Sequence, residues 1–146
     1  MRSARDIMTP APQIVDVSTS VIDIAKTLES QEIGAVIVCD PDRRLQGLIT
    51  DRDLAVQVVG AGRDPHDVTA GDIVGEREVV TIGADDSIDL AVSTMQEHAV
   101  RRLPVIDGTE VIGIVSQADI ARHLDGDKVG EMVESISEAR DNTARG

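Results

Sequence analysis

Gly113-Ile114-Val115-Ser116-Gln117-Ala118-Asp119 decides the fold, because the same pattern stands earlier in the chain as Gly47-Leu48-Ile49-Thr50-Asp51-Arg52-Asp53. Each copy reads glycine, two aliphatic residues, a hydroxyl residue, two variable positions and an aspartate. The offset between the copies is constant, since 113 − 47, 116 − 50 and 119 − 53 all equal 66. A chain of 146 residues that holds such a repeat is predicted to contain two similar lobes.

The repeat extends upstream as apolar positions with helical spacing. Val21, Ile24, Ala25 and Leu28 in the first half match Ile88, Ala91, Val92 and Met95 in the second half. Both sets follow the spacing i, i+3, i+4, i+7, which predicts one buried face of an amphipathic helix. Ser20 and Ser87 stand just before these helices, where we expect them to act as N-caps.

Continuous aliphatic runs follow each helix and predict buried strands. The runs span residues 35–39 and 103–106, and in each half a second strand leads into the seven-residue pattern. A second helix leaves that pattern, and a short helical segment and a β-like stretch open each half. We therefore predict an α/β fold of two tandem repeats, over residues 4–60 and 70–124.

Residues 125–146 fall outside the repeat. Val129, Met132, Val133 and Ile136 there have helical spacing. This spacing predicts a short amphipathic helix, which either covers one face of the pair or contacts a partner or second subunit.

The duplicated β-α-β-β-α unit resembles a known family. Each unit ends in Gly-aliphatic-aliphatic-Thr/Ser-x-x-Asp, and Arg101-Arg102-Leu103-Pro104-Val105 precedes the second copy, as in a CBS domain. Two copies over residues 4 to 124 resemble a CBS pair, or Bateman module, with pseudo-twofold symmetry, and the chain is most similar to the small stand-alone type of actinobacteria. The resemblance implies a regulatory module that forms a homodimer. It also implies that the matching Thr/Ser and Asp contact an adenosine nucleotide.

Composition excludes several classes of function. The net charge is −13 and Phe, Tyr and Trp are absent, so neither a basic surface nor an aromatic platform is available for nucleic acid. No apolar stretch approaches the roughly 20 residues of a membrane-spanning helix, and the first residues lack the apolar block of a signal peptide. One cysteine cannot form an internal disulfide. We expect a cytoplasmic protein that contacts neither nucleic acid nor membrane.

Catalysis and metal binding find little support in the sequence. His66, His98 and His123 have no neighbours that make a catalytic triad or a metal-ligand spacing, and no Walker-type phosphate loop occurs. Cys39 lies within an aliphatic run and is predicted to be a buried, inert thiol. We predict no catalytic residue, no metal site and no required cofactor.

Thr50-x-x-Asp53 and Ser116-x-x-Asp119 have two interpretations that both stay open. In the first, the hydroxyl residue caps a helix and the aspartate lies near the positive end of the helix dipole. In the second, the turn receives phosphate and the carboxylate accepts hydrogen bonds from ribose hydroxyls. The residues are the same in both interpretations, so spacing alone does not separate them.

The second copy has more positive charge than the first. Arg101 and Arg102 precede its strand, whereas Gly34 and Ala35 hold the aligned positions of the first half. Arginine suits phosphate geometry, so we expect Ser116, Asp119, Arg101 and Arg102 to form the better site, with Thr50 and Asp53 forming a weaker or empty one. The alternative for the two arginines is a surface ion pair with neighbouring carboxylates.

An adenine base would need an aliphatic slot beside the second copy. Val80 and Leu103 are candidates for that slot, although both are also natural core residues. Arg52 within the first copy would either face a shared cleft or lie on the surface.

Two hypotheses for function follow. The first is a stand-alone sensor that binds AMP, ATP or S-adenosylmethionine and signals to an unknown effector protein. The second is a ligand-free CBS-pair scaffold or interaction protein with a role in stress, whose motif residues only cap helices.

Overall fold

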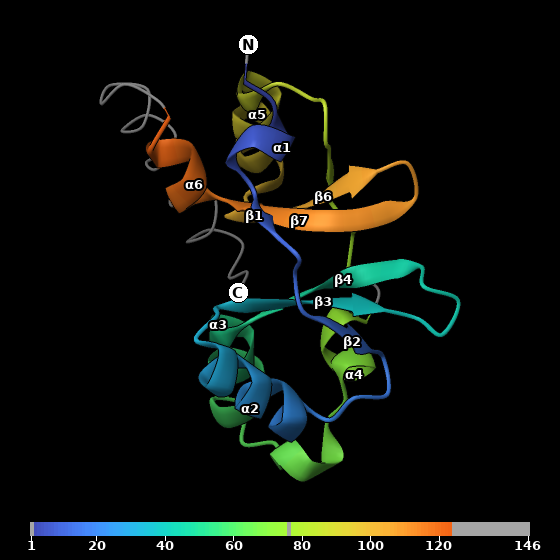
Figure 1. Cartoon of the computed structure of the whole chain (residues 1–146). Helices are drawn as coiled ribbons and strands as arrows, with labels where there is room; N and C mark the ends of the chain where they lie inside the picture. The colour runs from blue at the N-terminus through green and yellow to red at the C-terminus, as the bar shows by residue number, and fades with distance from the viewer. Residues whose placement is uncertain (1, 76, 124–146) are drawn as a thin grey trace. The chain divides into compact units, whose positions relative to one another are not determined.

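The structure is a computed structural model that describes residues 2–75 and 77–123. The predicted helix within residues 125–146 lies outside the described residues. The chain forms two compact units by its internal contacts. The early unit spans residues 13–79, and the late unit joins the N-terminal segment up to Pro12 to the chain from Val80 onward. Each unit is a mixed α/β structure (Figure 1).

The early unit contains a three-stranded sheet in the order β2-β3-β4. β2 (Ile14–Asp16) is parallel to β3 (Ala35–Cys39), and β3 is antiparallel to β4 (Leu45–Thr50). Its helices are α2 (Val21–Gln31), α3 (Asp51–Leu54) and α4 (Ala70–Val74). A π-helical turn (Ala55–Val59) continues α3, and a short 3-10 helix (Pro65–Asp67) precedes α4.

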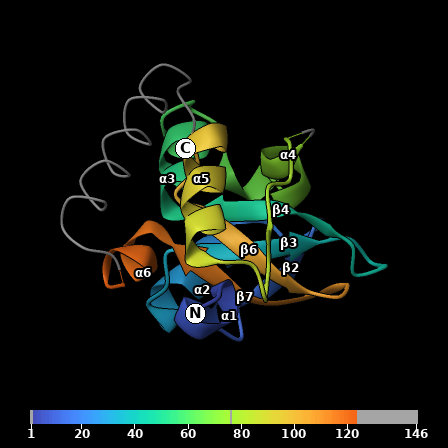
Figure 2. The ribbon, with the colours of Figure 1, turned by 90° about the horizontal axis from the view of Figure 1, so that it is seen from above.

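The late unit contains a four-stranded sheet in the order β1-β7-β6-β5. Its strands are β1 (Thr9–Pro10), β5 (Ile82–Gly83), β6 (Arg102–Asp107) and β7 (Glu110–Ser116). Its helices are α1 (Ala4–Ile7), α5 (Ile88–His98) and α6 (Gln117–Ala121). α5 lies against β6, as two views of the ribbon show (Figures 1 and 2).

The helices and central strands predicted from the repeat are confirmed. Ser20 and Ser87 cap α2 and α5, since their hydroxyls accept hydrogen bonds from the N–H groups of Asp23 and Leu90. The β-like stretch expected at the opening of the second half is the two-residue strand β5, because only Ile82 and Gly83 pair with β6. None of the helices in the described part of the chain has the length and apolar character needed to cross a membrane.

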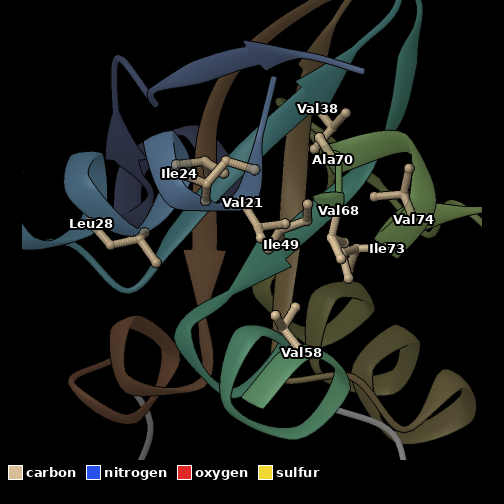
Figure 3. Close-up of a cluster of buried hydrophobic side chains, with 11 residues drawn as sticks. Val21, Ile24, Leu28, Val38, Ile49, Val58, Val68, Ala70, Ile73 and Val74 are labelled. Carbon is tan, nitrogen blue, oxygen red and sulfur yellow. The ribbon is translucent and has the colours of Figure 1, made fainter. Parts of the chain in front are cut away.

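The opening segment of each repeat packs in the unit that holds the other repeat's sheet. Ala4 and Ile7 of α1 are buried in the late unit among residues such as Met95 and Leu103. Ala70, Ile73 and Val74 belong to the core of the early unit, which Figure 3 shows together with Val21 and Ile24. The two segments make equivalent backbone hydrogen bonds: Ala4 to Asp86 and Arg5 to Ala84 at 2.9 Å, and Ala70 to Thr19 and Gly71 to Val17 at 2.8 Å.

The glycine of the seven-residue pattern makes room for the opening segment of the other repeat. A Cβ built on Gly113 would lie 2.4 Å from the sulfur of Met8 and 2.8 Å from the carbonyl oxygen of Thr9. A Cβ on Gly47 would lie 3.0 Å from a methyl group of Val74, which is the counterpart of Met8 at the 66-residue offset. The pattern therefore begins with glycine in both copies because another part of the chain crosses the strand there.

Candidate functional site

The first copy of the motif forms a closed cap at the start of α3. The Thr50 N–H donates to Asp53 Oδ2 at 2.8 Å, and the Asp53 N–H donates to Thr50 Oγ1 at 3.1 Å. The second carboxylate oxygen, Oδ1, accepts from Gln57 Nε2 at 3.1 Å and from Arg77 Nη2 at 3.2 Å. Asp53 is 2% exposed, so a buried negative charge is matched by a cation and by hydrogen bonds.

The second copy forms the same cap at the start of α6. The Ser116 N–H donates to Asp119 Oδ2 at 2.9 Å, and the Asp119 N–H donates to Ser116 Oγ at 3.1 Å. Asp119 Oδ1 accepts from Arg122 Nη2 at 2.8 Å. Asp119 is 6% exposed. Both copies therefore cap a helix, and Oδ1 of each aspartate accepts a hydrogen bond from an arginine guanidinium.

Two further Ser/Thr-x-x-Asp capping boxes occur at the starts of α1 and α4 and serve as an internal comparison. The Ser3 N–H donates to Asp6 at 2.8 Å, and the Thr69 N–H donates to Asp72 at 3.0 Å. These backbone hydrogen bonds stabilise the ionised forms and lower the pKa of both Asp6 and Asp72. Both aspartates are exposed. Capping therefore does not by itself require the burial and the arginine partner found at Asp53 and Asp119.

The strand register brings the predicted arginines to the second cap. Arg102 is paired with Ser116 across the β6–β7 ladder, and residues directly opposite on such a ladder point to the same face. The carbonyl of Arg101 accepts a hydrogen bond of 2.8 Å from the N–H of Gln117, the first residue of α6. Within residues 2–75 and 77–123, no ion pair joins Arg101 or Arg102 to a carboxylate.

The first cap has a guanidinium from Arg77 but no arginine pair on its strand. The equivalent carbonyl belongs to Gly34, which accepts from the N–H of Asp51 at 3.1 Å. The side chain of Asp51 accepts in turn from the N–H of Arg52 at 2.8 Å, so a second carboxylate lies at this cap. Gln117 replaces that carboxylate in the second copy. The side chain of Arg52 lies on the surface of the early unit.

The predicted aliphatic contacts belong to the core of the late unit. Leu103 is fully buried and offers no surface to a ligand in this conformation. Val80 is partly buried and packs against the same core cluster. Of the two predicted aliphatic contacts, only Val80 has surface that a ligand could reach.

Sequence reasoning missed three residues that contact the motif aspartates. Arg122 lies three residues after Asp119, directly after the end of α6, and this spacing could have identified it. Gln57 lies four residues after Asp53 and could have been found in the same way. Arg77 is 24 residues from Asp53 in an irregular segment, so no local pattern points to it.

Metal-ligating side chains do not gather in the described part of the chain. No group of three or more His, Cys, Asp or Glu side chains that could hold a metal ion occurs there. Burial raises the pKa of the Cys39 thiol, as expected for a side chain within the aliphatic strand β3.

Comparison with known proteins identifies the repeat. The family model of the CBS domain matches residues 4–60 and 70–126. Hypoxic response protein 1 of Mycobacterium tuberculosis is 38% identical over 136 residues, which cover 93% of this chain and 94% of the relative. The CBS domain-containing protein YhcV of Bacillus subtilis is 30% identical over 138 residues, covering 94% and 96%.

Solved structures agree with the sequence relatives. A crystal structure of hypoxic response protein I with two coordinated zinc ions has a TM-score of 0.73 at 40% identity, covering 85% of this chain and all of that chain. The CBS domain pair of protein MJ0100, in complex with 5-methylthioadenosine and S-adenosyl-L-methionine, has a TM-score of 0.70 at 25% identity, covering 84% and 95%. A hexameric CBS-CP12 protein from bloom-forming cyanobacteria has a TM-score of 0.75 at 25% identity, covering 83% and 70%.

Proposed function

As the chain belongs to the CBS-domain family, we propose that it is a regulatory module that binds an adenosine-type nucleotide at the second copy of the motif. One observation carries this proposal, namely the difference in charge between two caps of the same geometry. Arg101, Arg102 and Arg122 lie at or next to the second cap, while the first cap has Arg77 and an additional carboxylate from Asp51. In a chain of net charge −13, such a local excess of cations favours an anionic ligand.

Each residue of the second cap has a role in this proposal. Arg101 and Arg102 bind phosphate through their guanidinium groups, and the Ser116 hydroxyl supplies a further donor. Asp119 accepts hydrogen bonds from ribose hydroxyls, and Val80 contacts the base. Two arginines favour AMP or ATP over S-adenosylmethionine, because the sulfonium of the latter is positive and lacks phosphate.

In this proposal, nucleotide binding at the second cap shifts an equilibrium between two conformations of the protein. A ligand shifts such an equilibrium only if it binds one state more tightly than the other. The output passes to a separate effector protein in this proposal.

The test begins with ultraviolet absorption. Because the chain has no Phe, Tyr or Trp, the ligand-free protein absorbs little at 260 nm. A 260 nm band that stays with the protein through gel filtration, with a nucleotide identified by mass spectrometry of a denatured extract, supports the proposal. A flat spectrum, together with no heat of binding for millimolar AMP, ATP or adenosine, overturns it.

The arginine pair should set the preference for phosphate. Replacing Arg101 and Arg102 by glutamine is expected to weaken AMP binding by about tenfold or more, since each hydrogen bond to a charged group contributes about 1.5–3 kcal/mol. Adenosine binding should be unchanged, because adenosine lacks phosphate. Arg43 and Arg44 are an exposed pair in the early unit and provide a control that removes the same charge. An equal loss of AMP affinity in both double variants, measured by calorimetry, would contradict a phosphate site at the second cap.

We also propose that the protein forms a homodimer. The family resemblance supports this state, and the cyanobacterial CBS-CP12 neighbour is described as hexameric. Light scattering is expected to give twice the mass of the 15.5 kDa chain. A mass of one chain at high protein concentration would overturn the homodimer.

The ligand-free scaffold is a second candidate, and one observation favours it. Both oxygens of each motif aspartate already accept a hydrogen bond within the chain, through the caps and through Arg77 or Arg122. A ligand that binds the native state must stabilise it. If the protein is such a scaffold, none of a panel of nucleotides should raise its melting temperature.

A further inference from the structure

The N-terminal segment, defined here as residues 2–12, packs on the late unit, although the whole early unit separates the two in sequence. Ala4 is fully buried and Ile7 is 6% exposed in the core of the late unit. Arg5 forms ion pairs of 3.2 Å with Asp107 and 3.6 Å with Asp85. The late unit therefore has a fitted surface for a segment to which it is connected only through residues 13–79.

The connection between this segment and the early unit is short and strained. The Ala11 N–H donates to the carbonyl of Ile112 in the late unit at 3.2 Å, whereas the carbonyl of Gln13 accepts from the N–H of Ile37 in the early unit at 2.8 Å. Pro12 alone lies between these two anchored residues. Ala11 has a φ of 51°, in the left-handed region that favours glycine and costs an alanine free energy.

The residue after Ala11 favours a different backbone conformation. A proline biases the residue before it toward extended backbone, and Pro12 follows Ala11 directly. An extended Ala11 removes the left-handed strain and straightens the hinge, so the segment leaves its own late unit. A second copy of the chain offers the same surface with the same contacts.

We propose that the N-terminal segments of two copies of this chain swap, so that each packs on the late unit of the other copy. The swapped dimer keeps the buried Ala4 and Ile7, the ion pairs of Arg5 and the pairing of β1 with β7 (Figure 1). Ala11 becomes extended in both copies. Short hinges under strain favour such swapping, and swapping is a low-cost route to a dimer because the contacts already exist. The proposal does not depend on nucleotide binding.

A pair of engineered cysteines distinguishes the two arrangements. Ser3 and Ser87 form an antiparallel β-bridge between the N-terminal segment and the late unit. Residues opposite each other in antiparallel strands have Cα atoms about 4.5–5.5 Å apart, within the range of about 4.4–6.8 Å that a disulfide spans. Ser3→Cys with Ser87→Cys, made in a Cys39→Ala background, is incubated at increasing protein concentrations, oxidised briefly and run on a denaturing, non-reducing gel. A swapped dimer gives a covalent dimer whose fraction rises with concentration, and an unswapped chain gives a monomer.

The early unit provides a matched control. Ser20 and Thr69 form the corresponding antiparallel bridge, but both belong to the contiguous residues 13–79. Ser20→Cys with Thr69→Cys should therefore give a linked monomer at every concentration. Monomers alone from Ser3→Cys with Ser87→Cys overturn the swap, as do dimers from both pairs or a Ser3–Ser87 pair that stays unlinked while the control pair is linked. If the gel shows monomers while light scattering gives twice the chain mass, the swap is wrong and the homodimer stands through another surface.

The hinge itself supplies a second test. Ala11→Gly should lower the yield of covalent dimer by about fivefold or more, the change in equilibrium that corresponds to the left-handed strain of one alanine. Arg43→Gly is the control, because Arg43 has a φ of 64° in an exposed turn outside the hinge and its replacement should leave the yield unchanged. Equal yields from the native hinge and Ala11→Gly, or an equal fall in Arg43→Gly, overturn the proposal.

Discussion

Asp119→Ala is expected to weaken binding of an adenosine nucleotide by about 1.5–3 kcal/mol, the contribution of hydrogen bonds to a charged group. This loss corresponds to a rise in Kd on the order of 10- to 150-fold. The physical reason is that Asp119 is the one carboxylate at the second cap with an oxygen outside the capping box. Calorimetric titration of AMP into both proteins measures the difference directly.

Asp53→Ala is the matched control for this prediction. Both substitutions remove a capping aspartate that is almost fully buried, so both should lower the melting temperature. Only Asp119→Ala should also lower nucleotide affinity, because Arg77 and Gln57 hold the first carboxylate and Asp51 adds negative charge there. Equal affinity of the wild type and Asp119→Ala would remove Asp119 from the ribose role.

Ile73→Ala is expected to lower the free energy of unfolding by about 2–5 kcal/mol, as for other buried isoleucines truncated to alanine. Ile73 is 3% exposed and lies in the core of the early unit with Val21 and Ile24, although it belongs to the second repeat by sequence. The substitution leaves a cavity between α4 and that core. Urea unfolding measures the loss.

Hydrogen exchange then tells which unit carries the loss. Protection should fall first in β3 and β4 of the early unit, and β6 and β7 should be affected less. Ile14→Ala provides the control, since Ile14 is 53% exposed in the same unit and its truncation should change stability by less than about 0.5 kcal/mol. If Ile73→Ala were as mild as Ile14→Ala, or if protection fell first in the late unit, the packing of α4 described above would be contradicted.

Local patterns predicted most of the helices and strands. α2 and α5 follow from apolar residues at helical spacing, and β3 and β6 follow from continuous aliphatic runs, because in these elements the buried face is written into the sequence. β1 was not predictable in this way, since its residues Thr9 and Pro10 are exposed. The exchange of α1 and α4 was also missed, because periodicity identifies an apolar face and not the sheet that covers it.

The contacts of the candidate site also separate into those that local sequence predicts and those that depend on tertiary structure. Ser/Thr-x-x-Asp predicted both caps correctly because the hydrogen bonds of a capping box join residues three apart. The pairing of β6 with β7 places Arg102 opposite Ser116, and the sequence predicted both strands but not their register. Arg77 reaches Asp53 across 24 residues of chain, and such a contact depends on tertiary structure that no local spacing encodes.

The exchange of the opening segments, which hold α1 and α4, constrains the order of folding during translation. Residues 13–79 form one contiguous unit, so this unit can be completed while the rest of the chain is still being translated. The first residues cannot finish folding at that time, because β1 must pair with Gly113 and Ile114 of β7. Ala4 and Ile7 are therefore buried only after β7 has been made, although they are translated before residues 13–79.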